Sequence, residues 1–303
     1  SWVPGRTEEC LQPTNNAFIA QKLREMADLL EAQDADGFRV AAYRRAGDTV
    51  DRLSQPLEDI FAAKGQDGLI ALPAIGRGIS SAIMEILRTG RWAALERISG
   101  ALEPEQLFQT VPGIGPALAQ LIHDELHIDT LEQLEMAAHS GRLEALPGLG
   151  ARRVSAIRAV LGQRLGSRRL PVPSETAQPD VEILLDVDRE YRERAAAGEL
   201  RLITPKRFNP SGEAWLPILH TGRGDWAFTA LFSNTRKAHD LGRLRDWVVL
   251  YFHGDHDHED QCTVVTEHRG PLTGRRVVRG RERACEAYYD REATDEEHFE
   301  RKA

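Results

Sequence analysis

The chain has 303 residues, a formal net charge of −8, 41% hydrophobic residues and 28% charged residues. This length allows two domains, and the composition is ordinary for a globular protein. No apolar run reaches the ~18 residues of a membrane span, and the first ten residues lack the apolar core of a secretory signal. Three cysteines without CxxC spacing argue against a disulfide framework or a cysteine zinc site. We expect a cytoplasmic protein without membrane association. The acidic total does not exclude local basic patches.

Residues 14–165 carry the apolar periodicity of helices, most clearly over 17–33. Within them one pattern occurs three times: an apolar residue, proline, a small residue, an apolar residue and glycine, followed by a helix. The copies are LPAIGRGISSAIMEIL from Leu72, VPGIGPALAQLIHDEL from Val111 and LPGLGARRVSAIRAVL from Leu146. The repeat predicts an all-helical region built around three glycine hairpins.

The pattern changes after a stretch rich in proline, serine and threonine. Strands are predicted at VEILLDV and LRLITP, on either side of a helix at DREYRERAAAG. Two antiparallel hairpins follow, EAWLPILHT with WAFTALF and DWVVLYF with CTVVTEH. The predicted fold is therefore multi-domain, with an all-α helix-hairpin-helix N-terminal domain and an α+β C-terminal domain. The expected boundaries are 14–98 for the helical unit with the first hairpin, 99–165 for a tandem of the other two, 166–179 for a linker, 180–290 for the α+β domain and 291–303 for a polar tail or solvated helix.

The hairpin glycines suggest a binding function. A helix N-terminus exposes unsatisfied N–H groups and a partial positive charge, which suit a phosphate. Glycine removes the Cβ that would hold the phosphate away and tolerates positive φ. Such contacts bind a nucleic-acid backbone without selecting a sequence. The alternative for each hairpin is a tight turn that needs glycine for packing, but three copies with basic residues nearby favour phosphate binding.

The three hairpins differ in charge. The first has Ala74 in place of its first glycine, and its helix starts with Arg77; the second has few basic residues. The third is followed by Arg152 and Arg153, and the segment 142–169 contains seven arginines and one acid. This local basic patch is typical of nucleic-acid contact. The predicted DNA-binding positions at the hairpins are Gly76, Arg77, Gly113, Gly115, Gly148, Gly150, Arg152 and Arg153.

Together with FRVAAYRRAGDTV and EILRTGRWAALERI, these hairpins resemble the N-terminal part of X-family DNA polymerases over residues 14–165. The resemblance implies a lyase-like, 5′-phosphate-binding first unit and a fingers-like tandem that grips duplex DNA. It adds Arg39, Tyr43 and Arg44 as phosphate-binding positions. It also implies a monovalent cation, Na⁺ or K⁺, held by backbone carbonyls near Val111, Gly113 and Ile114.

The lyase chemistry of that family is not expected here. Its reactive lysine forms a Schiff base with an abasic sugar. The matching position is Ala82, the neighbouring phosphate-binding lysine position is Gly78, and the helix RGISSAIMEIL has no lysine.

The family's polymerase centre is also not recognisable. It contains a Gly-Ser element and an Asp-x-Asp pair that holds two Mg²⁺ ions. The stretch LLDVDREY offers Asp186 and Asp188, whose alternation would place both on one face of a strand, but no Gly-Ser precedes them. The favoured interpretation of the two aspartates is a strand end whose negative charge suits the N-terminus of the next helix.

Three further features of the C-terminal half have open roles. The loop HGDHDHEDQC contains metal-ligand residue types, although a solvated loop tip between strands is favoured. The segment 269–283 has six arginines and one acid, and it suits an edge strand with an exposed basic face that binds DNA or an acidic surface, including the chain's own acidic tail. Trp215, Trp226 and Trp247 favour core or rim packing over base stacking.

These observations predict a monomeric DNA-binding protein that captures backbone phosphates independently of sequence, on duplex, gapped or 5′-phosphorylated DNA, with a possible role in DNA repair. One alternative is a divergent nucleotidyltransferase or nuclease that uses Asp186 and Asp188 with Mg²⁺. A second is a protein-interaction module in which the hairpins are only structural.

Overall fold

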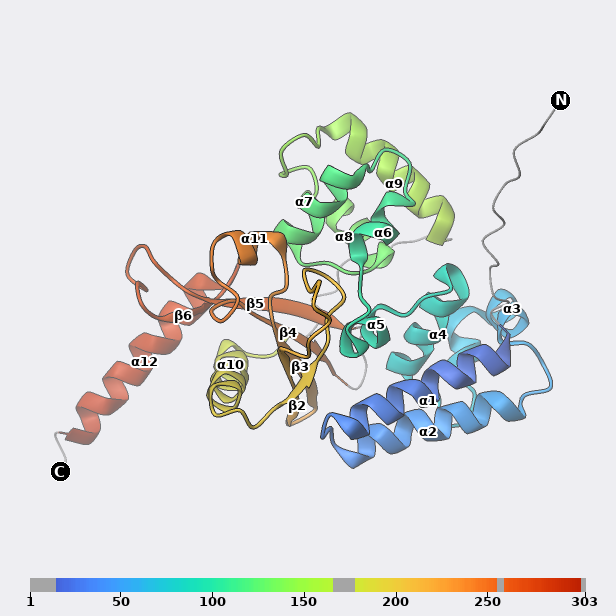
Figure 1. The fold of residues 1–303 in the computed structure, drawn as a ribbon, viewed down its shortest axis with the longest axis horizontal. Coiled ribbons are helices and arrows are strands. Elements are labelled where there is room, and N and C mark those ends of the chain that lie inside the picture. The colour runs from blue at the N-terminus through green and yellow to red at the C-terminus, as the bar shows by residue number, and fades with distance from the viewer. Residues whose placement is uncertain (1–14, 166–177, 255–258, 301–303) are drawn as a thin grey trace.

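The computed structural model describes residues 15–165, 178–254 and 259–300. Residues 15–165 contain helices and connecting turns but no strand, as predicted. Helix α1 (Asn16–Ala32) begins at Asn15, whose side chain accepts a hydrogen bond from the Phe18 N–H. Its apolar stripe packs against α2 (Gly37–Arg52) as a long antiparallel pair (Figure 1). The remaining helices of this region are α3 (Leu57–Ile70), α4 (Arg77–Thr89), α5 (Ala93–Ser99), α6 (Pro104–Gln109), α7 (Pro116–Leu126), α8 (Leu131–His139) and α9 (Ala151–Leu165).

The C-terminal half contains one six-stranded antiparallel sheet in which each strand pairs with the next along the chain. The strands are β1 (Arg201–Ile203), β2 (Leu216–Arg223), β3 (Trp226–Phe232), β4 (Val248–His253), β5 (Asp260–Thr266) and β6 (Arg276–Val278). Both predicted hairpins are confirmed: β2 pairs with β3 around Gly224 and Asp225, and β4 pairs with β5. The multi-domain fold class is therefore confirmed. The helices of this half are α10 (Val181–Ala196), α11 (Arg236–Asp240) and α12 (Glu282–Glu300).

The prediction of a strand at VEILLDV is wrong, because these residues begin helix α10. The buried residues of α10 are Val181, Leu184, Leu185, Val187, Asp188 and Tyr191. Most of them recur at helical spacing, but the buried Asp188 breaks the apolar periodicity of this face. The seven residues before it therefore look like a short apolar strand in the sequence. The Tyr191 hydroxyl donates to the Pro217 carbonyl and accepts from the Phe232 N–H, which fixes α10 on the sheet.

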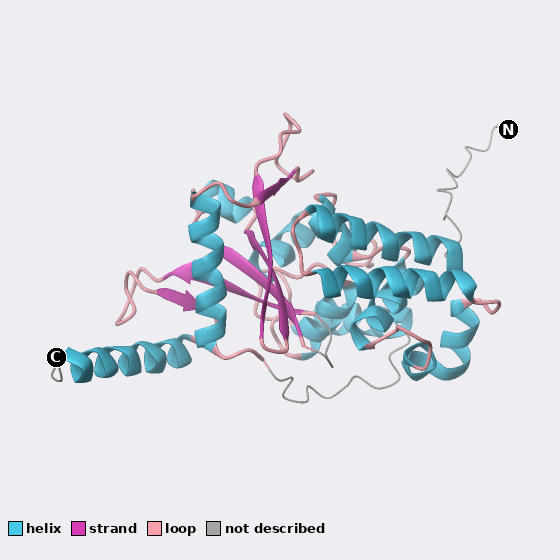
Figure 2. Ribbon diagram, turned by 90° about the horizontal axis from the view of Figure 1, so that it is seen from below, coloured by secondary structure: helices cyan, strands magenta, loops and turns pink. Residues whose placement is uncertain are grey.

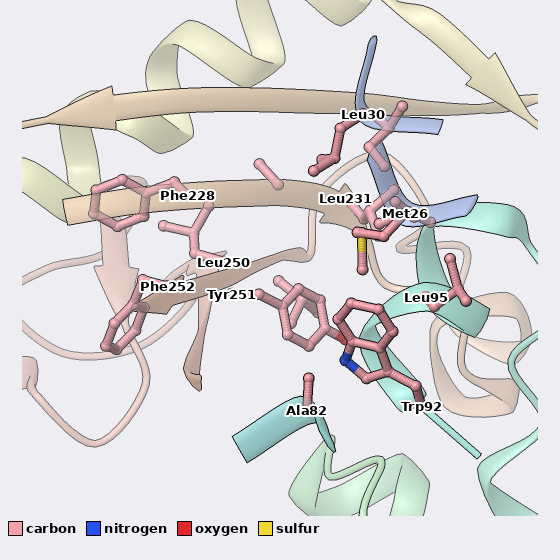
Figure 3. Close-up of a cluster of buried hydrophobic side chains, with 14 of the residues drawn as sticks. Met26, Leu30, Ala82, Trp92, Leu95, Phe228, Leu231, Leu250, Tyr251 and Phe252 are labelled. Carbon is pink, nitrogen blue, oxygen red and sulfur yellow. The ribbon is translucent and has the colours of Figure 1, made fainter. Parts of the chain in front are cut away.

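The chain has two apolar cores rather than one core for each predicted domain. The first core combines the helices of residues 16–99 with the sheet and α10. Figure 3 shows this contact, where Met26, Trp92 and Leu95 approach Leu231 and Tyr251 of the sheet. The second core lies entirely within residues 107–165. The first helical unit and the α+β half thus share a core, whereas the tandem has its own.

The basic segment 269–283 forms an edge strand only over β6, and its central arginine is not part of an exposed basic face. Arg276 forms ion pairs with Asp188 and Asp246 at 2.6 Å each, and its side chain is 13% exposed. Arg279 lies 3.5 Å from Glu267. Arg276 therefore holds β6 against α10 instead of extending a DNA-binding surface.

Residues 291–300, predicted as part of a polar tail or solvated helix, form the distal part of α12, which projects from the body (Figure 2). Most of the predicted linker, residues 166–177, lies outside the described residues, as do residues 255–258 of the histidine-rich loop. Among the described residues no helix is long and apolar enough to cross a membrane.

Candidate nucleic-acid interface

The three hairpins have the same backbone geometry. In each, the N–H before the final glycine donates to the carbonyl of the first motif residue: Ile75 to Leu72 at 3.3 Å, Ile114 to Val111 at 3.1 Å and Leu149 to Leu146 at 3.2 Å. In each, the carbonyl of the final glycine accepts the first helical hydrogen bond, from Ser80, Ala119 and Val154, at 2.9–3.1 Å. The sequence repeat is therefore a structural repeat of turn and helix start.

The third motif position explains one of the two glycines. Gly113 has a φ of 93° and Gly148 a φ of 80°, a region that favours glycine. Ala74 occupies the same position in the first hairpin and adopts a φ of 60°. The first hairpin keeps the turn without its glycine, at the cost of a conformation that L-residues rarely adopt.

The glycine at the helix start has no such conformational reason. Gly76 and Gly115 have φ values of −83° and −88°, which any residue adopts, and Gly150 also lies outside the positive-φ region. A Cβ added at any of the three would meet no protein atom within 4 Å. By contrast, a Cβ at Gly100 would lie 2.2 Å from the Thr204 carbonyl oxygen. The protein's own packing therefore requires Gly100 but none of the three helix-start glycines.

The helix starts also keep free donors. Neither α4 nor α7 has a side-chain cap, so no capping side chain occupies their first N–H groups, and Pro116 leaves α7 with one donor fewer. At the third hairpin Gly148, Gly150, Ala151, Arg152, Arg153 and Ala156 line a shallow depression of about 600 Å³. The third hairpin thus combines glycines whose Cβ positions are empty with a concave surface.

The third hairpin carries the strongest positive charge. Arg152 and Arg153 are exposed, and the Arg153 Nη1 donates to the Gly148 carbonyl at 3.0 Å. Arg164 further along α9 donates to Thr110, the residue before the second hairpin. No carboxylate of the described residues forms an ion pair with Arg142, Arg152, Arg153, Arg158 or Arg164. The predicted basic patch therefore keeps its charge available.

The first hairpin exposes the residues at the start of α4, whereas the next turn of that helix is buried. Gly76, Arg77 and Gly78 are exposed. Ala82, the position where the resembling family has its reactive lysine, is only 6% exposed and lies in the first core (Figure 3). A lysine amine there would have to leave the apolar contact between α4 and the sheet.

The predicted phosphate positions on α2 face other partners. The Arg39 Nη1 lies 3.4 Å from the Thr229 hydroxyl of β3, and the Arg39 Nε is buried without a hydrogen bond to any described residue. The Tyr43 ring packs against Trp92, with ring centroids 5.7 Å apart, and burial raises its pKa. Arg44 pairs with Glu31 at 2.6 Å and approaches Asp28. Arg39 and Tyr43 thus lie along the contact with the rest of the first core.

Asp186 and Asp188 do not form a metal-binding pair on a strand. They lie two residues apart on α10, and such residues do not face each other on a helix. Asp188 is fully buried and pairs with Arg192 at 2.9 Å and with Arg276. Asp186 pairs with Arg189 and Arg223. The strand geometry that the nucleotidyltransferase alternative needs to hold two Mg²⁺ ions is therefore absent at this pair.

The remaining metal predictions concern backbone carbonyls at the second hairpin and a histidine-rich loop that is only partly described. Among the described residues no three His, Cys, Asp or Glu side chains are grouped so as to hold a metal ion. The Val111 carbonyl accepts the hairpin bond from Ile114, and a monovalent cation at Val111, Gly113 and Ile114 stays a prediction.

A buried polar junction that sequence reasoning missed fixes the tandem on the rest of the chain. Arg97 of α5 donates to Asp129 at 3.0 and 3.2 Å and to Glu259 at 2.8 Å, and its guanidinium lies 3.4 Å from the ring centroid of Tyr251. Arg97 and Asp129 are 5% and 1% exposed. Further contacts join Lys237 to Glu125 and the Arg236 N–H to Asp124. No motif signals these residues, because they come from three distant segments.

Comparison with known proteins agrees with this arrangement. Residues 14–92 match a helix-hairpin-helix domain model, and residues 105–162 match a SAM-like helix-hairpin-helix tandem. The chain is 26% identical over 147 residues to the DNA polymerase/3'-5' exonuclease PolX of Bacillus subtilis (strain 168), covering 48% of this chain and 25% of that protein. It is 27% identical over 118 residues to DNA polymerase lambda of Rattus norvegicus, covering 37% and 19%.

The chain therefore spans about a quarter or less of the length of these relatives. The helix-hairpin-helix matches and the polymerase relatives support DNA binding. The N-terminal half of this chain is a helix-hairpin-helix region related to X-family DNA polymerases.

Proposed function

We propose that this protein grips the phosphate backbone of duplex DNA at its three hairpins, without selecting a base sequence. The main contact is at the third hairpin, and its donors are the first N–H groups of α9 together with Arg152 and Arg153. The second hairpin adds the start of α7, and the first adds Gly76, Arg77 and the start of α4.

The observation that carries the proposal is the open space at the helix-start glycines. Gly76, Gly115 and Gly150 satisfy no steric or conformational need of the free protein. Each lies where a phosphate would approach the first N–H groups of a helix, and there a Cβ would obstruct the ligand. This argues against the alternative in which the hairpins are only packing turns.

The donors also favour binding that is independent of sequence. Backbone N–H groups and exposed arginines contact phosphates, which are the same at every base pair. A role for Arg39 and Tyr43 in binding a 5′-phosphate would require both side chains to leave their contacts with Thr229 and Trp92. The proposal is therefore confined to the duplex backbone.

The test is the double variant Gly115→Ala/Gly150→Ala in the full chain. The free energy of unfolding should fall by no more than about 1–2 kcal/mol, because alanine is a poorer N-cap than glycine but offsets part of this loss by restricting the unfolded chain. The affinity for duplex DNA, measured by fluorescence anisotropy in a salt titration, should fall about tenfold or more, since each obstructed site loses charge-assisted hydrogen bonds.

The matched control is Gly162→Ala, at the other end of α9, where a Cβ would meet only a Glu135 oxygen at 3.9 Å. This variant should bind DNA as the wild type does. Unchanged affinity in the double variant, or no binding of duplex DNA by the wild type at low salt, would reject the proposal.

A further inference from the structure

Three aromatic rings gather beside the tandem, on the loop between β1 and β2 and on α11. The ring centroids of Phe208 and His239 are 4.8 Å apart, and those of Trp215 and His239 are 6.3 Å apart. The Arg207 guanidinium lies 4.8 Å from the Phe208 centroid. We refer to Phe208, Trp215 and His239 as the ring cluster.

Phe208 adopts a strained backbone conformation in the loop between β1 and β2. Its φ is 51°, which is an outlier for a bulky residue, and its side chain is 39% exposed. Such strain costs about 1–3 kcal/mol and persists only when neighbouring contacts impose it. Here the Asn234 Nδ2 donates to the Arg207 carbonyl and the Arg207 Nη1 donates to the Asn234 carbonyl. A strained and exposed ring does not serve the core, and strain of this kind concentrates at binding sites.

The ring cluster is continuous with the DNA-binding tandem. Arg207 forms an ion pair with Glu105 of α6, the helix that leads into the second hairpin. On α11, Lys237 pairs with Glu125 near the C-terminal end of α7. Because α7 has 11 residues, its two ends are about 16 Å apart. A DNA strand held at the start of α7 would reach the ring cluster within a few nucleotides.

The local chemistry suits a planar base more than a phosphate. Lys206, Arg207 and Lys237 already pair with Glu103, Glu105 and Glu125, so the surface gains little net positive charge. Burial and the nearby Arg207 lower the pKa of His239, which keeps its ring neutral and able to stack. Aromatic faces with an adjacent guanidinium bind bases by stacking, with about 1–3 kcal/mol for each base.

We propose that the ring cluster binds an unpaired base of a DNA strand whose duplex portion is held by the hairpins. This inference rests on the proposed function, and it adds a preference for DNA with a single-stranded part. The preference should depend only weakly on salt, because stacking releases few counterions, whereas binding at the hairpins should depend on salt steeply.

The test compares the full chain on a blunt duplex, on the same duplex with a short single-stranded thymidine extension, and on the thymidine strand alone, at low and high salt. The wild type should bind the extended duplex at least about fivefold more tightly than the blunt one. Phe208→Gly should lose this difference and keep its affinity for the blunt duplex, since glycine adopts the positive φ without strain and only the ring is removed. Phe208→Trp should retain the difference.

The matched control is Phe38→Ala, which removes an exposed phenylalanine from α2, outside the ring cluster, and should change nothing. Equal affinity of the wild type for the two duplexes, or a difference that persists in Phe208→Gly, would overturn the inference and leave the proposed function intact. Phe208-dependent binding of the thymidine strand without duplex binding would instead reject the proposed function and support the ring cluster.

Discussion

The first helical unit and the tandem contain the same hairpin, but they are attached to the molecule differently. The first unit packs its apolar face into the core that it shares with the sheet, and its Ala82 and Tyr43 lie at that contact. The tandem has a separate core and meets the rest through ion pairs and hydrogen bonds around Arg97. The same turn thus occurs in two settings. The first hairpin belongs to a unit that shares an apolar core with the sheet, whereas the second and third belong to a tandem that contacts the rest of the protein through polar groups.

The largest effect that tests this comparison is expected at the polar junction. Arg97→Ala should lower the free energy of unfolding by about 3–5 kcal/mol, because Asp129 would remain buried without its cation. Urea denaturation followed by fluorescence and by circular dichroism measures this loss. If the tandem can unfold independently of the rest of the chain, the unfolding curves from fluorescence and from circular dichroism should no longer coincide in this variant.

The matched control for the junction is Arg91→Ala, which breaks a partly exposed pair with Glu96 within the first unit. Its cost should stay below about 1 kcal/mol. An Arg97→Ala protein as stable as this control would show that the apolar contacts alone hold the tandem.

The next effect distinguishes the two kinds of hairpin by charge. Arg152→Glu/Arg153→Glu should weaken duplex DNA binding more than tenfold. The slope of log K against log salt concentration should become about 2 units shallower, since two phosphate contacts are lost. Arg77→Glu should weaken it less, because the first hairpin has a single arginine at its helix start. Anisotropy titrations at several salt concentrations give both quantities. Equal losses at the two hairpins would contradict the ranking.

A smaller effect is expected from pH. Burial lowers the pKa of His123 and His220 to about 3 and that of His127 to about 4, with a nearby charged group adding to the shift in each case. Their neutral forms therefore contribute stability that is full above the unfolded pKa of about 6.5 and is lost as pH falls toward 3. Each histidine changes the free energy of unfolding by at most about 1.4 kcal/mol per pH unit.

Glu85 acts in the opposite direction, because burial raises its pKa to about 8 and its neutral form stabilises the fold below that pH. The three histidines should outweigh it between about pH 6.5 and 4.5, the window set by the unfolded pKa values of histidine and glutamate. Urea denaturation at about pH 7 and pH 5 checks this balance, and Glu85→Gln should make the loss toward pH 5 steeper. A protein that is equally stable at both pH values would contradict the burial of these imidazoles as neutral groups.

The smallest expected effect is a null result at the first hairpin. Borohydride reduction in the presence of abasic DNA should trap no covalent adduct, because Ala82 cannot form a Schiff base and α4 contains no lysine. A trapped adduct would show that another amine does this chemistry, and it would make the first hairpin more than a DNA contact.

The sequence by itself determined the local features of this protein. The apolar periodicity fixed the helices of residues 16–165, the alternating patterns fixed the two strand hairpins, and the repeated glycines fixed the three turns. All of these depend on interactions between residues close in the chain. The basic patch around Arg152 could also be predicted, since its arginines lie in one segment.

Only the tertiary structure decided which residues are available. VEILLDV is a short apolar run that suits a strand or a helix, and in the structure it begins α10, in which the next residue, Asp188, is buried against Arg276. Arg39 contacts Thr229 and Tyr43 packs against Trp92, at the border of the first core. Phe208 packs against His239 in the ring cluster. Their partners lie 31 to 190 residues away in the chain, and pairings over such distances leave no periodic pattern in the sequence.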